Sequence, residues 1–242
     1  GATPMDRPEW GAVNPLNGEV YMAMTNNTDR TAEDADAANP RAPNRYGHIV
    51  RWREDGDRTD AMGFDWDIFV FGSRSEGLPA DSADANLSGL DAMNDFASPD
   101  GLWFDRRGVL WVQTDDTGDY TYGSASLGNE ALSNNQMLAV IPARMRDIQN
   151  TAEPVITAEN QAELRRFFVG PKQCEVTGVD ITPDGRTMFV NIQHPGERGN
   201  FAEPGSNWPH PNGDAMAVPP AGIRPRSATV VVTREDGGVI GL

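Results

Sequence analysis

Residues 174–194 read CEVTGVDITPDGRTMFVNIQH, in which two runs rich in β-branched and aromatic residues flank a Pro-Asp-Gly turn. This pattern predicts two antiparallel strands joined by a tight turn. It occurs twice more, as PEWGAVNPLNGEVYMAMTNN at residues 8–27 and PDGLWFDRRGVLWVQTDD at residues 99–116. Each copy begins with an acid, turns at a glycine and ends in polar residues; the acids are Glu9, Asp100 and Glu175, and the glycines are Gly18, Gly108 and Gly185.

Further strand candidates follow the first two hairpins, at residues 48–52, 66–71, 137–141 and 166–169, and one follows the third at residues 228–233. A hairpin followed by two strands is typical of a propeller blade, and recurrence of the unit is typical of a propeller. We therefore predict an all-β chain, with residues 1–242 forming about three blades of a β-propeller. Helix is expected only at residues 142–149, with a second possible turn at residues 158–165.

Charge and cysteine content exclude several classes of function. The chain has 20 Lys and Arg against 36 Asp and Glu, a formal net charge of −16, and no basic cluster. Nucleic acid and anionic membranes are therefore not expected as partners. The single cysteine, Cys174, excludes an internal disulfide and a zinc site of several thiolates, and it is expected to be a small buried apolar residue.

The repeated acids suggest a metal site. In a propeller the first strand of each blade lines the central channel, so Glu9, Asp100 and Glu175 are expected to face one axis. Clustered carboxylates need a cation, and hard oxygen ligands suit Ca²⁺ or a ferric ion. Because Asp-Gly is also common in turns, a turn role stays open for Asp100, and Asp184 is expected to serve its turn.

Other polar residues lie close to these acids in sequence. Asp115 and Asp116 end the second repeat and could complete a calcium shell or cap the strand end. Lys172 and Arg7 precede Glu175 and Glu9, where a cationic head could meet a phosphate oxygen or simply be solvated. His194 could bind a metal or a substrate oxygen, or be structural.

The chain resembles the PhoX family of alkaline phosphatases in a series of phrases: RPEW, NPRAPNRYGHIVRW, SPDGLWFDRRGVLWVQTDD, NNQML, CEVTGVDITPDGRTMFVNIQHPGE and SATVVVTREDGG. The strand-turn phrase is shared by many propellers, whereas the combination of CEVTG with NIQHPGE is specific. The resemblance implies a periplasmic or secreted bacterial phosphomonoesterase that uses calcium and an oxo-bridged iron pair on a six-bladed propeller.

The resemblance also implies roles for individual residues. Glu9 of RPEW and Glu175 of CEVTG resemble metal-bridging carboxylates of the catalytic site, and Lys172 is the basic residue we place beside them. The family's iron-binding cysteine belongs to an N-terminal segment rich in Gly and Trp, which is not found in residues 1–242. The chain is therefore expected to be a C-terminal portion that needs the N-terminal half to bind iron and has little phosphatase activity alone.

Two other functions stay open. A calcium-dependent lactonase-like propeller would explain Glu9 and Asp100, although not CEVTG or NIQHPGE. A non-catalytic propeller piece used for binding or assembly would fit the count of about three blades. Because an open part of a ring leaves sheet edges and apolar faces uncovered, self-association is also expected.

Overall fold

The computed structural model describes residues 2–75, 79–116, 134–210 and 224–241. These residues form an all-β structure of antiparallel sheets, and their helix is limited to short 3₁₀ turns: Ala32–Asp34, Asp55–Asp57, Pro142–Arg144 and Gln161–Glu163. No helix within the described ranges is both long enough and apolar enough to span a bilayer.

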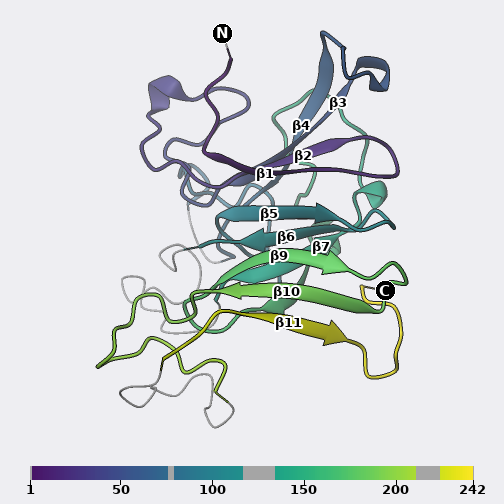
Figure 1. Cartoon of the computed structure of the whole chain (residues 1–242). Coiled ribbons are helices and arrows are strands. Elements are labelled where there is room, and N and C mark those ends of the chain that lie inside the picture. Colours follow the sequence, from purple (N-terminus) through teal and green to yellow (C-terminus); the bar gives the residue numbers. More distant parts are fainter. Residues whose placement is uncertain (1, 76–78, 117–133, 211–223, 242) are drawn as a thin grey trace. The chain divides into compact units, whose positions relative to one another are not determined.

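The two predicted four-stranded units are present as two open sheets with the strands in chain order (Figure 1). The first sheet contains β1 (Pro8–Val13), β2 (Val20–Met24), β3 (His48–Glu54) and β4 (Phe64–Phe71). The second contains β5 (Pro99–Phe104), β6 (Leu110–Thr114), β7 (Gln136–Val140) and β8 (Arg165–Val169). The strand candidates named from the sequence agree with these strands to within two residues.

The third sheet has three strands, which are β9 (Glu175–Ile181), β10 (Thr187–Gln193) and β11 (Ala228–Thr233), in the order β11-β10-β9. Burial alternates along β10: Met188, Val190 and Ile192 are buried, whereas Phe189 and Asn191 are exposed. Such alternation is typical of an antiparallel sheet that is covered on one face.

The sequence repeat is also a backbone repeat. The hairpins β1–β2, β5–β6 and β9–β10 each turn at a glycine with positive φ, at Gly18 (77°), Gly108 (80°) and Gly185 (71°). In each repeat the residue two places before the acid also has a left-handed backbone; these are Arg7 (φ 50°), Ser98 (51°) and Gln173 (56°). Because non-glycine residues rarely adopt this conformation, its occurrence at three equivalent positions supports the repeat independently of the sequence.

The helix expected at residues 142–149 was wrong, because only Pro142–Arg144 forms a 3₁₀ turn. The residues that follow are held by Asp67 instead. Its carboxylate accepts hydrogen bonds from Arg146 Nη1 at 2.7 Å and from the backbone N–H of Gln149 at 3.2 Å. These long-range contacts override the local helix preference.

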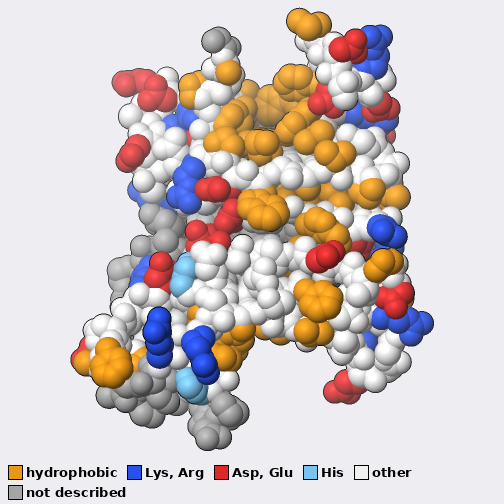
Figure 2. Space-filling view, viewed as in Figure 1, with side chains coloured by type: hydrophobic (Ala, Val, Ile, Leu, Met, Phe, Trp, Pro, Cys, Tyr) orange, Lys and Arg blue, Asp and Glu red, His pale blue; other side chains and the backbone are white. Residues whose placement is uncertain are grey.

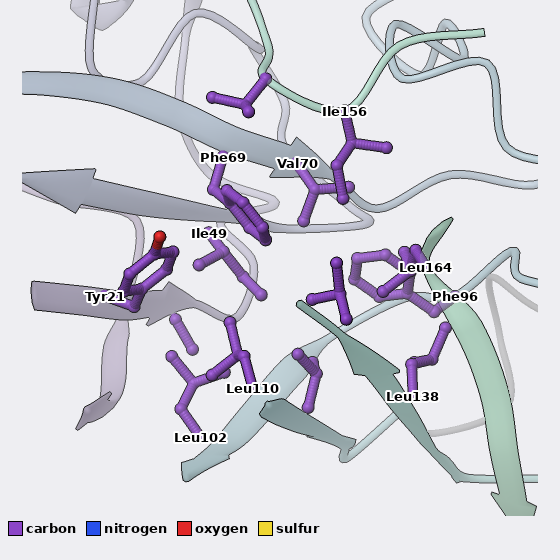
Figure 3. Packing of buried hydrophobic residues seen from close by; sticks show 14 of the residues in the cluster. Tyr21, Ile49, Phe69, Val70, Phe96, Leu102, Leu110, Leu138, Ile156 and Leu164 are labelled. Carbon is purple, nitrogen blue, oxygen red and sulfur yellow. The ribbon is translucent and has the colours of Figure 1, made fainter. Parts of the chain in front are cut away.

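The chain divides into two compact units, Gly1–Val112 with Leu138–Arg166, and Gln113–Met137 with Phe167–Leu242. The core of the first unit centres on Tyr21, whose ring makes edge-on contacts with Phe69 and Phe104 at centroid distances of 5.1 and 5.2 Å. Figure 3 shows Tyr21, Phe69, Leu102, Leu110 and Leu138 among the residues of this cluster. Aromatic side chains bury large areas, so this cluster is the main apolar support of the first unit.

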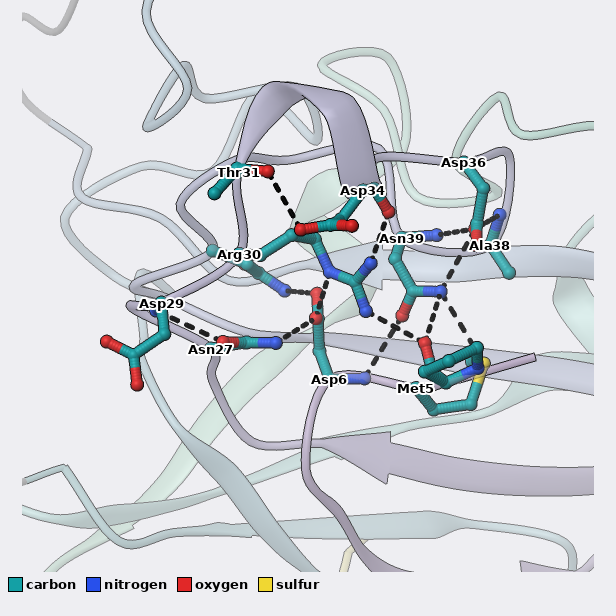
Figure 4. Close-up of polar contacts among 12 residues, drawn as sticks. Met5, Asp6, Asn27, Asp29, Arg30, Thr31, Asp34, Asp36, Ala38 and Asn39 are labelled. Atoms are coloured by element: carbon teal, nitrogen blue, oxygen red, sulfur yellow. Dashed lines mark hydrogen bonds and ion pairs between the residues drawn. The ribbon is translucent and has the colours of Figure 1, made fainter. Parts of the chain in front are cut away.

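Buried charge in the first unit is neutralised by arginine. Asp6 is fully buried and accepts hydrogen bonds from Arg30 Nε, Asn27 Nδ2 and Asn44 Nδ2 (Figure 4). Arg30 Nη2 also donates to the carbonyl oxygen of Pro4 at 2.8 Å. Because the buried carboxylate is paired and hydrogen-bonded, the network fixes the residues before β1 to the loop after β2.

Candidate metal centre

Two acids of the second unit lie close together. Asp115 follows the last residue of β6, and Glu175 is the first residue of β9. Each offers a carboxylate oxygen that lies within 4.8 Å of the other. Glu175 is buried and Asp115 is half-buried, so their mutual repulsion is poorly screened by water. Two carboxylates so arranged suit a hard cation.

Asn135 holds the two segments together. Its side-chain amide donates to the carbonyl oxygens of Asp116 at 2.9 Å and Cys174 at 2.8 Å. Its side-chain oxygen accepts from Thr114 Oγ1 at 2.8 Å and from the backbone N–H of Asp116 at 2.6 Å. One buried side chain therefore uses all its hydrogen-bonding groups to join the end of β6 to the start of β9.

The carboxylate of Glu175 has two neighbours from the end of β10. Gln193 lies opposite Glu175 in the strand register, and its Nε2 donates to Glu175 Oε2 at 2.6 Å. His194 Nε2 lies 3.3 Å from the same oxygen, and His194 Nδ1 lies 3.6 Å from Glu197 Oε2. These contacts orient the carboxylate at the end of its strand.

Comparison with known proteins identifies the family. The model of the family described as "Alkaline phosphatase PhoX" matches residues 1–196. The chain belongs to the PhoX alkaline phosphatase family. A solved structure of Pseudomonas fluorescens PhoX, in complex with vanadate as a transition-state analogue, is similar at 41% sequence identity with a TM-score of 0.75. The match covers 100% of this chain and 36% of that one, so the chain spans just over a third of that PhoX's length. A search of the curated proteins finds no match.

Cys174, which directly precedes Glu175, was predicted to be a small buried apolar residue. Cys174 is 2% exposed, and burial raises the pKa of its thiol to about 12. A raised thiol pKa is typical of a cysteine packed in apolar surroundings rather than of a reactive one. Packing is tight, since a Cβ on Gly170 would lie 2.4 Å from the sulfur. The expectation that Cys174 is a small buried residue is confirmed.

The structure does not decide the roles of Asp116 and Lys172, the other two predicted site residues of the second unit. Asp116 is buried, and its backbone groups bond to Asn135, in agreement with the strand-end role that was left open for it. Lys172 is exposed in the turn before β9, where its carbonyl oxygen accepts the N–H of Gly196 at 3.0 Å. Ligation by Asp116 and catalysis by Lys172 stay predictions.

Glu9 and Asp100 belong to the first unit. Glu9 lies on the exposed strand β1, and its Oε1 accepts a hydrogen bond from Arg7 Nε at 3.1 Å. Arg7 therefore contacts the acid that it precedes. Asp100 is the second residue of β5 and is half-buried. A role in metal binding stays a prediction for both acids.

The turn role predicted for Asp184 is confirmed. Its Oδ1 accepts hydrogen bonds from Thr182 Oγ1 at 2.6 Å and from the backbone N–H of Arg186 at 3.1 Å. The bond from Thr182 contributes most to lowering the pKa of this carboxyl below its usual value.

Sequence reasoning missed Asn135 and Gln193. Asn135 lies in the phrase NNQML, which contributed to the PhoX resemblance but had no role of its own. The signal available for Gln193 was the hairpin register, because a strand end paired with Glu175 must lie beside that acid.

Proposed function

We propose that this chain supplies part of the active site of a metal-dependent phosphomonoesterase of the PhoX type. The observation that carries the proposal is the close pair of carboxylates, Asp115 and Glu175, held in register by Asn135 in a member of this family. The vanadate complex of the Pseudomonas fluorescens relative supports phosphate chemistry, because vanadate is described there as a transition-state analogue.

Calcium is the cation that we propose for Asp115 and Glu175. Both offer the hard carboxylate oxygens that Ca²⁺ prefers, and Asn135 fixes the backbone that carries them. When bound, such an ion neutralises developing negative charge on a phosphate ester. We further propose that Glu9, Asp100 and Asp116 are additional ligands of the PhoX site.

Local cations are needed near this site because a chain of net charge −16 repels phosphate at long range. We propose that the exposed Lys172 ammonium binds a phosphate oxygen, and that Gln193 and His194 hold the Glu175 carboxylate in position. Cys174 is buried, and the family resemblance places the iron-binding cysteine in an N-terminal segment rather than here. We therefore propose that iron needs residues from the N-terminal half of the parent protein.

The third sheet favours assembly with that half. It has three strands where the other two sheets have four, and β11 is at its edge. Phe189 and Val231 face each other across β10 and β11, and they are 40% and 58% exposed. We propose that this edge and apolar pair are covered when a six-bladed propeller is completed, and that in the isolated chain they promote self-association. Sedimentation of the isolated chain as a strict monomer would count against the second statement.

The experiment that tests the function is metal analysis of the purified chain combined with hydrolysis of p-nitrophenyl phosphate. Activity is assayed with added calcium and iron, for the chain alone and after mixing with an N-terminal fragment of a PhoX protein. We expect calcium in the isolated chain, little turnover alone, and turnover on mixing. Absence of bound metal and of activity under every condition would refute the proposal, and lactone hydrolysis with calcium alone would favour the lactonase alternative.

The proposal extends to the cellular location of the parent protein. We propose that the parent protein is exported to the periplasm or secreted, as its family resemblance implies. Cell fractionation that finds the parent protein only in the cytoplasm would contradict this.

A further inference from the structure

A cavity of about 760 Å³ lies in the second unit beside the end of β10. Its lining includes His194, His210, Arg224, Arg226 and Ser227, together with two prolines. Figure 2 shows basic and histidine side chains on the face that carries the loops around β10 and β11. The cavity is within the size range of small-molecule sites and carries nitrogen donors rather than acids.

The backbone around the cavity is anchored. His194 donates its backbone N–H to Ser227 Oγ at 3.0 Å, and Arg226 donates its own to the carbonyl oxygen of Trp208 at 3.2 Å. His210 Nε2 lies 3.3 Å from the carbonyl oxygen of Arg224. These contacts tie the segment that begins at Arg224 to the segment that follows β10.

The two arginines differ from most others in the chain. Arg53, Arg58 and Arg234 are exposed, and each forms an ion pair with an aspartate two to four residues along the chain. Arg224 and Arg226 are also exposed, but neither forms an ion pair with an acid in the ranges that the structure describes. In a chain with 36 acids, two such cations around one cavity favour an external anion.

His194 connects this cavity to the candidate metal centre. It lines the cavity, and its Nε2 lies 3.3 Å from Glu175 Oε2. A molecule whose phosphate lay at Glu175 would therefore extend its remaining part toward Arg224 and Arg226.

We infer that the cavity is an anion subsite that binds a second negatively charged group, a phosphate or carboxylate, of the phosphate ester. This inference rests on the proposed function and deepens it. It predicts a preference for esters with a second anionic group over simple monoesters, because arginine forms charge-assisted hydrogen bonds with phosphate and carboxylate oxygens.

The test is direct binding of methylenediphosphonate, a bis-anion that is not hydrolysed, to the purified chain by calorimetry. Metal ions are first removed with EDTA, which is then dialysed away because its own carboxylates would compete for the subsite, and low salt limits screening. We expect the unmodified chain to bind the bis-anion. The double variant Arg224→Ala/Arg226→Ala should bind it with an affinity that is lower by roughly tenfold or more. The matched control is Arg58→Ala, which removes an exposed arginine of the first unit and should bind as the unmodified chain does.

A double variant with Lys at both positions keeps the charge and should regain part of the affinity, which separates anion binding from loss of folding. No binding by the unmodified chain, or equal binding by the alanine variant, would overturn the subsite. Calcium binding is measured separately in the absence of EDTA. Its absence would count against the proposed metal centre, while arginine-dependent binding of the bis-anion by the metal-free chain would still support the subsite.

Discussion

Asp67 in the first unit and Glu175 in the second are both buried acids on strands, but their surroundings differ. Asp67 accepts hydrogen bonds from Arg51 Nη2 at 3.1 Å and Arg146 Nη1 at 2.7 Å. The neighbours of Glu175 include Gln193, His194 and a second acid, Asp115. The first arrangement pairs one acid with two guanidinium groups, whereas the second brings two acids close together.

The difference separates a structural acid from a candidate ligand. A buried carboxylate with two guanidinium partners cross-links the fold, and it has no need of an ion. Two close carboxylates repel each other, and a bound cation relieves that repulsion. Removing an acid should therefore destabilise the first unit, whereas in the second it should mainly weaken metal binding.

The largest effect on the free energy of unfolding is expected for Asp67→Asn. The change leaves two arginines without their shared carboxylate, and breaking such a buried pair costs about 3–5 kcal/mol. Urea unfolding measures the loss. The matched control is Asp65→Asn on the exposed part of the same strand, which should cost much less. A loss below about 1 kcal/mol for Asp67→Asn would contradict a structural role.

The stability of the first unit should decrease at acid pH because of His48. The ring is fully buried, and burial lowers the pKa of His48 to about 4. The unfolded chain, with a pKa near 6.5, therefore binds more protons between these values. The contribution of His48 to the free energy of unfolding should be constant above about pH 6.5 and fall by about 1.4 kcal/mol per pH unit from there down to about pH 4. The free energy of unfolding should differ less between pH 7 and pH 5 in His48→Gln than in the unmodified chain. An equal difference in the two proteins would refute this role of His48.

Asn135→Ala should affect both stability and metal binding in the second unit. Four buried hydrogen bonds are lost, so we expect a destabilisation of about 2 kcal/mol. Calcium affinity should fall by about 10–100-fold, the usual effect of removing a group that orients ligands. The control is the neighbouring Asn134→Ala, which loses one bond, to the carbonyl oxygen of Gly170. Equal calcium affinity in the two variants would rule out positioning by Asn135.

The smallest effect on stability is expected for Glu9→Gln. Glu9 is paired with Arg7 at the surface, and exposed ion pairs contribute little, so the free energy of unfolding should change by less than about 0.5 kcal/mol. If Glu9 is a ligand, calcium affinity falls although stability does not. Unchanged calcium affinity would remove Glu9 from the proposed ligand set.

The sequence predicted the hairpins well because their determinants are local. Gly18, Gly108 and Gly185 occupy turn positions that need positive φ, and the apolar runs beside them match the strands. The all-β class and the four-stranded units followed from the repeat. Closure into a propeller stays a prediction, since it depends on contacts beyond any one hairpin.

The site was predictable only in part. Glu175 was predicted because it is the acid that begins a repeat and is expected to face the channel, and Asp115 because it belongs to the polar residues that end a repeat. Asn135 could not be chosen in this way, because its role depends on joining segments 19 and 39 residues away. The helix expected at residues 142–149 failed for the same reason, since Asp67 holds that segment from 79 residues away.

Calcium titration by calorimetry of the unmodified chain, Glu175→Gln and Asp115→Asn tests most directly whether the second unit holds a metal. We expect the unmodified chain to bind calcium and each variant to lose affinity by roughly tenfold or more, while its free energy of unfolding without calcium changes much less than that of Asp67→Asn. Equal calcium affinity in all three proteins would show that this carboxylate pair is not a metal site.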